Sequence, residues 1–116
     1  MASDHKDYKA LIKGINAGIS GLQGHIGETM KGFGAMAKAA GAEGAVDAKT
    51  KELIALAIGV ATKCDGCIGF HTKKLVDLGA TDEEVAETLA MCVYMGGGPS
   101  LMYAADAWTA WEQFRG

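Results

Sequence analysis

The sequence predicts an all-α fold, a single-domain bundle of about six helices. Along most of the chain apolar residues recur at intervals of three and four, the spacing that places side chains on one face of a helix. No segment shows the period-two alternation of a half-buried strand. The chain has 116 residues, and domains usually have roughly 100–200. We therefore expect residues 1–116 to form one domain.

Two helices are expected in the first third of the chain. The apolar face of the first helix carries Tyr8, Leu11, Ile12, Ile15, Ile19 and Leu22. Gly14, Gly18 and Gly21 interrupt it at about 1 kcal/mol each relative to alanine, so this helix either frays or packs its backbone closely against a neighbour. The second helix carries Ile26, Met30, Phe33 and Ala37 at the same spacing and should end near Ala40.

The third and fourth helices are marked by their ends. Asp47 is a good N-cap for the third, because its carboxylate can accept backbone N–H groups of the first turn. The segment from Leu53 to Ala61 is apolar nearly all round, so we expect this helix to be buried. A fourth helix should occupy residues 65–78 and end at Gly79, which suits a left-handed C-cap.

Two further helices complete the predicted bundle. Thr81 and Glu84 form a capping box at the start of the fifth, which runs to about Met95. The glycines at 96–98 and Pro99 should stop it, because proline lacks the N–H that a helix interior needs. A terminal helix then carries Leu101, Ala104, Ala105, Trp108, Trp111 and Phe114.

Charge and composition exclude several partners. Lys plus Arg is 11 and Asp plus Glu is 14, and no basic stripe is present, so no nucleic-acid partner is expected. The longest apolar run, Leu53 to Ala61, is far shorter than the about 20 residues of a membrane span. The N-terminal residues lack the apolar region of an export signal, and we expect a cytoplasmic protein without a membrane partner.

The densest group of reactive side chains is Cys64, Cys67 and His71. If a helix begins near Cys64, the spacings i, i+3 and i+7 place all three on one face. The positive end of the helix dipole and a neighbouring imidazole both favour a thiolate near neutral pH. Two thiols at this spacing can also close a disulfide. Glu52, on the preceding helix, can hydrogen-bond His71 and fix its tautomer.

Other interpretations of this motif remain open. A C-x-x-C pair can be accidental, and Cys64, Cys67, His71 and Glu52 can supply four ligands to zinc or iron. No second Cys/His pair supports the metal site. Covalent haem attachment is excluded because Ile68, not histidine, follows the second cysteine. The third cysteine, Cys92, lies in the apolar pattern of its helix and is expected to be buried and inert.

A glutamate, eleven intervening residues and then C-x-x-C-x-x-x-H, on an all-helical chain of this size, resemble the carboxymuconolactone decarboxylase superfamily, and specifically its alkylhydroperoxidase D-like branch. The resemblance covers about residues 46–111. It implies an all-α bundle that assembles as homotrimers or homohexamers. It also implies that the cysteine pair reduces peroxides or exchanges disulfides.

Carried over by position, the resemblance assigns four roles. Cys67 is the attacking thiol, Cys64 its resolving partner, His71 the proton acceptor and Glu52 the group that completes the relay. Gly66 departs from the best-known peroxidase members, which have a histidine immediately before the second cysteine. The decarboxylases that name the superfamily generally lack the cysteine pair, so its presence argues against lactone decarboxylation.

The expected function is that of a cysteine-based antioxidant peroxidase or disulfide reductase. Its substrate would be an alkyl or other hydroperoxide and its electron donor a thiol or dithiol, with no organic cofactor and no metal. Two alternatives remain. One is decarboxylase or lactone chemistry in which Glu52 and His71 act as acid and base. The other is a metal-binding or redox-sensing helical oligomer.

Overall fold

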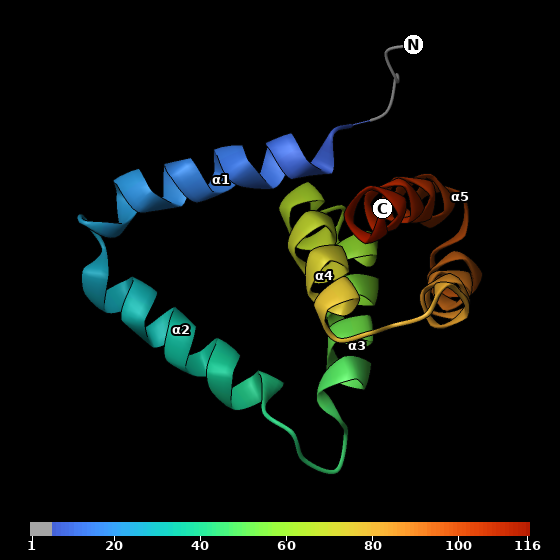
Figure 1. Cartoon of the computed structure of the whole chain (residues 1–116), viewed down its shortest axis with the longest axis horizontal. Helices are drawn as coiled ribbons and strands as arrows, with labels where there is room; N and C mark the ends of the chain where they lie inside the picture. The colour runs from blue at the N-terminus through green and yellow to red at the C-terminus, as the bar shows by residue number, and fades with distance from the viewer. Residues whose placement is uncertain (1–5) are drawn as a thin grey trace.

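Five helices make up the described part of the computed structural model, residues 6–116 (Figure 1). In chain order they are α1 (Tyr8–Gln23), α2 (Gly27–Gly41), α3 (Ala48–Ala61), α4 (Asp65–Asp77) and α5 (Asp82–Arg115). The prediction of an all-α, single-domain bundle is confirmed. The N-terminal residues 1–5, in which no export signal is expected, lie outside the described part. Within residues 6–116 no helix is both long and apolar enough to cross a membrane.

The predicted break at residues 96–99 is confirmed: Gly97 has non-helical backbone angles, φ 69° and ψ −150°, and the chain turns back on itself there. The two helices predicted on either side of this kink are joined as one element, α5, so five helices stand where about six were expected. Trp111 Nε1 donates a hydrogen bond of 2.7 Å to Asp82 Oδ1. In a straight helix residues so far apart in sequence would be about 40 Å apart. The two arms of α5 therefore lie side by side.

The core lies where α3, α4 and the two arms of α5 meet. These helices contribute most of the buried apolar side chains, among them Leu56, Val60, Ile68, Leu75, Val85 and Trp111. The expectation that α3 is buried on all sides is wrong for this chain alone. Leu56 and Val60 are fully buried, whereas Ile54 and Ile58 on the other side of α3 are 48% and 57% exposed.

The N-terminal helices project from this core as an open arm (Figure 1). Tyr8 and Ile12 of α1 are buried against α4, whereas no residue of α2 is buried. The glycines of α1 do not mediate close packing: a Cβ added at Gly14 or Gly18 would meet nothing within 4 Å. The close approach occurs instead on α4, where a Cβ at Gly69 would lie 2.5 Å from the Ile12 Cγ2 atom.

The predicted helix ends are confirmed where side chains or glycine define them. Asp47 accepts a hydrogen bond of 2.7 Å from the Thr50 backbone N–H. Gly79 has the left-handed φ of 75° that its position after α4 requires. Thr81 and Glu84 make both hydrogen bonds of the capping box. These local signals determine where α3 begins, where α4 ends and where α5 begins.

Candidate functional site

Cys64 and Cys67 lie at the beginning of α4 and are joined as a disulfide, with their Cα atoms 5.2 Å apart. Cys64 is the N-cap residue, in an extended backbone conformation, and Cys67 lies in the first turn. The Cys67 backbone N–H donates a hydrogen bond of 3.2 Å to Cys64 Sγ. A sulfur atom in this position receives an N–H group that has no partner within the helix. Both cysteines are half-buried.

A tight connection from α3 to α4 presents the cysteine pair. Lys63 has a positive φ of 58°, and the Cys64 N–H donates to the Gly59 carbonyl oxygen at 2.9 Å. Gly59 also allows α3 to approach Cys67 closely, because a Cβ added there would lie 3.0 Å from the Cys67 Cβ atom. The short turn and the small residue hold the disulfide against the end of α3.

The expected hydrogen bond between Glu52 and His71 is present, with His71 Nδ1 2.8 Å from Glu52 Oε1. Side-chain exposure is 32% for His71 and 19% for Glu52, so both are partly shielded from water. When Nδ1 carries the proton and donates to the carboxylate, Nε2 is the ring nitrogen that can accept one. His71 follows Cys67 by one helical turn on α4. The structure thus brings together on neighbouring helices the four residues selected from the sequence.

A small hollow gives access to the Glu52–His71 pair. It has a volume of about 230 Å³ and lies between the end of α2 and the facing sides of α3 and α4. Its walls are mainly small residues, Ala37, Ala40 and Gly41 from α2 and Ala55 from α3. Such a space admits a small molecule beside the imidazole. The contribution of α2 to this wall was not evident from the sequence, because only the fold brings it over α3.

The sequence gives no sign of an ion-pair network around Asp65, one of the two residues between the cysteines. Lys6 Nζ lies 2.8 Å from Asp65 Oδ1 and 3.0 Å from Asp106 Oδ2. Tyr8 donates a longer hydrogen bond, 3.5 Å, from its hydroxyl to Asp65 Oδ1. Nothing in the local pattern marks these partners, because three distant segments supply them.

Within residues 6–116, no three side chains of His, Cys, Asp or Glu are grouped so that they could hold a metal ion. The Cys64 and Cys67 sulfur atoms, which the zinc interpretation would use, are bonded to each other. The redox interpretation uses the same two atoms as they stand.

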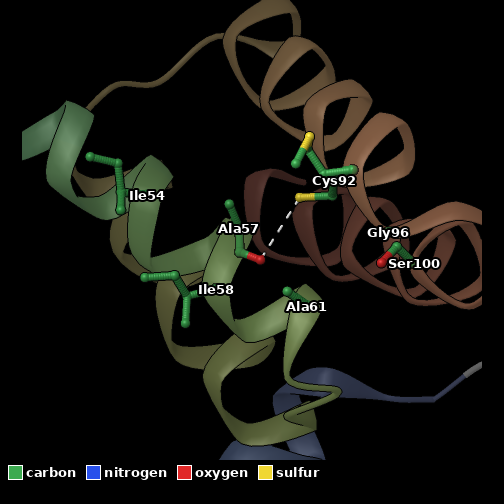
Figure 2. A pocket seen from close by; sticks show the side chains of 8 residues that line it. Ile54, Ala57, Ile58, Ala61, Cys92, Gly96 and Ser100 are labelled. Atoms are coloured by element: carbon green, nitrogen blue, oxygen red, sulfur yellow. Dashed lines mark hydrogen bonds between the residues drawn. The ribbon is translucent and has the colours of Figure 1, made fainter.

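Cys92 is buried, as predicted, and lies on α5 facing α3 (Figure 2). Its Sγ lies 3.8 Å from the Ala57 carbonyl oxygen and 3.5 Å from that of Thr88. Burial raises the pKa of the Cys92 thiol above its usual value. The apolar hollow beside it, about 360 Å³, includes Ile54, Ile58 and Met95 in its lining. This thiol belongs to a different part of the molecule from the disulfide.

Comparison with known proteins assigns the chain to a family. The family model described as the carboxymuconolactone decarboxylase family matches residues 27–110. The chain belongs to this family. The family match extends over α2 to α5, the helices that carry the disulfide, the Glu52–His71 pair and the hollow beside it.

Relatives of similar length support the family assignment. An uncharacterised protein of Cupriavidus necator is 41% identical over 101 residues, which is 87% of this chain and 89% of that protein. Uncharacterised protein 4 in the cox locus of Paracoccus denitrificans is 34% identical over 84 residues, 72% of this chain and 76% of that protein. The similarity therefore extends over most of each of these small proteins.

Solved structures of the family share the fold. The crystal structure of apo-lpg0406, a carboxymuconolactone decarboxylase family protein from Legionella pneumophila, has 52% identity and a TM-score of 0.92, covering 94% of this chain and 97% of its own. A family protein from Thermotoga maritima has 29% identity and a TM-score of 0.74, covering 95% and 91%. The Thermotoga protein is described as a candidate for involvement in an antioxidative response.

Proposed function

We propose that this family member is a thiol-dependent peroxidase or disulfide reductase of the alkylhydroperoxidase D-like branch. The observation that carries the proposal is the Cys64–Cys67 disulfide at the N-terminus of α4, with the Glu52–His71 pair one turn further along. A pair that closes and reopens between neighbouring positions needs no external resolving thiol. The antioxidative description of the Thermotoga maritima protein supports the same chemistry.

The catalytic cycle begins with the two cysteines reduced. The Cys67 thiolate attacks one oxygen of a hydroperoxide and the O–O bond breaks, which leaves a sulfenic acid on Cys67 and an alkoxide. A proton held on His71 Nε2 passes to the alkoxide, and an alcohol leaves. Two electrons have moved from sulfur to the peroxide. Glu52 stabilises the imidazolium through the Nδ1 hydrogen bond.

The Cys64 thiol then attacks the Cys67 sulfur. The sulfenic oxygen leaves as water with the thiol proton, and the disulfide forms. A dithiol donor restores the pair by exchange, supplying two electrons and two protons and becoming a disulfide itself. This cycle requires no organic cofactor and no metal. A reducing cytoplasm would supply such donors.

The test measures hydroperoxide consumption with a dithiol reductant in four proteins. Wild type and Cys92→Ser should turn over at similar rates, because Cys92 takes no part. Cys67→Ser should be inactive, and Cys64→Ser should consume one equivalent in a burst and then slow to the rate at which the dithiol itself reacts with the Cys67 sulfenic acid. A burst that survives only in Cys67→Ser would exchange the roles of the cysteines. Full turnover in both variants would contradict the proposal and favour acid–base chemistry by Glu52 and His71.

A further inference from the structure

A negative charge lies inside the proposed redox site. Asp65 follows Cys64 directly as the first residue of α4, and its side chain is 36% exposed. A carboxylate at this position stabilises the helix N-terminus through the helix dipole. The same carboxylate opposes a thiolate on the neighbouring sulfur atoms, because like charges disfavour each other's ionised form. Asp65 alone would therefore make the reduced pair less reactive.

Lys6, which lies just before α1 in the sequence, compensates this charge. Its ammonium group bridges Asp65 and Asp106 at 2.8 and 3.0 Å and lies 5.3 Å from the centroid of the Tyr103 ring. The hydrogen bond to Asp65 is the main cause that raises the pKa of Lys6. Lys6 thus stays fully charged throughout the pH range in which cysteines titrate.

The backbone beside Lys6 is anchored, which distinguishes this ion pair from a mobile surface pair. Gln113 Nε2 donates to the Lys6 carbonyl oxygen at 2.9 Å, and Gln113 Oε1 accepts from the Tyr8 N–H at 2.8 Å. Tyr8 is fully buried. An exposed ion pair contributes little to stability when the entropy lost in ordering two long side chains offsets the electrostatic attraction between them. Here Gln113 and Tyr8 already hold the segment next to Asp65.

We propose that Lys6 is a positioning residue for the dithiol, which acts through Asp65 to keep the reduced cysteines in their reactive thiolate form at neutral pH. The other titratable groups in contact with Lys6, Asp65 or the proposed proton relay are Tyr8 from α1, Tyr103 and Asp106 from α5, and the hydrogen-bonded Glu52 and His71 from α3 and α4. The inference rests on the proposed function for its biological meaning. Its test uses the thiols alone.

The experiment measures the rate at which iodoacetamide alkylates Cys64 and Cys67 as a function of pH, in the reduced full-length protein. Lys6→Met should move the titration midpoint to higher pH by about half a unit, a roughly threefold loss of rate below the midpoint. Lys6→Arg should stay near wild type because it keeps the charge. Lys9→Met is the matched control, since Lys9 is an exposed lysine three residues further along, in the first turn of α1, with no ion pair among residues 6–116.

Asp65→Asn shows whether the effect of Lys6→Met is electrostatic or comes from a disturbed fold. Alone it should move the midpoint to lower pH, and in the Lys6→Met background it should reverse the alkaline shift. Unchanged midpoints in both Lys6→Met and Asp65→Asn would overturn the inference, as would an alkaline shift that Asp65→Asn does not reverse. If Lys6→Met does not fold, Asp65→Asn still tests the inference. A midpoint moved to lower pH supports it, and a midpoint that is unchanged or moved to higher pH contradicts it. If the alkylation midpoints shift as expected but the wild-type protein does not consume peroxide, only the proposed function is contradicted.

Discussion

At the scale of single residues, His71 follows Cys67 on α4 and is hydrogen-bonded to the carboxylate of Glu52. Its position one turn after Cys67 follows from helix geometry, and its Nδ1 hydrogen bond to Glu52 follows from the packing of α3 on α4. The ring can therefore hold a proton on Nε2 while Glu52 stabilises the charged form. This pairing leads to a testable pH dependence.

We expect His71→Gln to lower peroxide turnover about tenfold or more at neutral pH, because a free thiol titrates near pH 8.5 and only its thiolate reacts. The pH–rate profile should move to higher pH, and part of the activity should return as the pH is raised. Glu52→Gln, which acts through His71, should give a smaller shift in the same direction. Profiles that coincide with wild type in both variants would reduce the pair to a structural role.

Cys92 should be an unreactive thiol, in contrast to the reactive thiolate proposed for Cys67. Its burial raises its pKa, so it stays protonated and unreactive at neutral pH. In the oxidised native protein an alkylating reagent should modify Cys92 slowly, and faster as the pH rises or once the chain unfolds. Mass mapping should find Cys64 bridged to Cys67 and Cys92 reduced. A bridge from Cys92 to either motif cysteine would contradict this assignment.

At the scale of helices, α4 is positioned by close contacts rather than by its own propensity. Gly59 brings α3 to within contact of Cys67, and Gly69 brings α1 against the opposite side of α4. Glycine is unfavourable in a helix interior relative to alanine. Gly59 of α3 and Gly69 of α4 are explained by this proximity, whereas Gly14 and Gly18 of α1 have open space around them in this chain.

A pair of glycine substitutions tests this difference. Gly69→Ala should lower the free energy of unfolding by about 1–2 kcal/mol, because its Cβ would overlap the branched Ile12 side chain and force α1 from α4. Gly14→Ala, the matched control, should raise it by about 0.5–1 kcal/mol through helix propensity. Denaturant unfolding measures both. Stabilisation by Gly69→Ala would show that α1 does not pack against α4 in solution.

At the scale of the whole molecule, the chain leaves many large apolar side chains uncovered. Phe33 and Met36 of α2 are 60% and 61% exposed, and Ile54, Ile58, Met91, Tyr94, Met95, Leu101 and Met102 are exposed as well. A helix as short as α2 is marginal in water without packing, and none of its residues is buried here. Contacts with further copies of the chain would supply that packing.

We therefore expect a homo-oligomer by light scattering at micromolar concentration, and the family resemblance implies a homotrimer or homohexamer. Phe33→Asp should lower the measured mass by placing a charge on the apolar face of α2, whereas Thr29→Asp, also exposed on α2, should leave it unchanged. A stable monomer in the wild type would contradict this prediction. An unchanged mass in Phe33→Asp would show that α2 does not form the interface.

The sequence by itself determined which segments are helical, where several of them begin and end, and which side chains are the candidates for chemistry. Periodicity, the Asp47 cap, the capping box at Thr81 and the spacing of Cys64, Cys67 and His71 all act within about one turn of helix. Such effects depend on neighbours in the sequence. They can therefore be inferred without knowing how the helices pack.

Only the tertiary structure decided how these helices combine. It placed Lys6 on Asp65, turned α5 back so that Trp111 meets Asp82, and left one side of α3 exposed. The first two contacts join segments that are far apart in the chain. The exposure of α3 depends on how much of its surface the other helices cover. Such pairings follow from the packing of all the helices together, which no local pattern encodes.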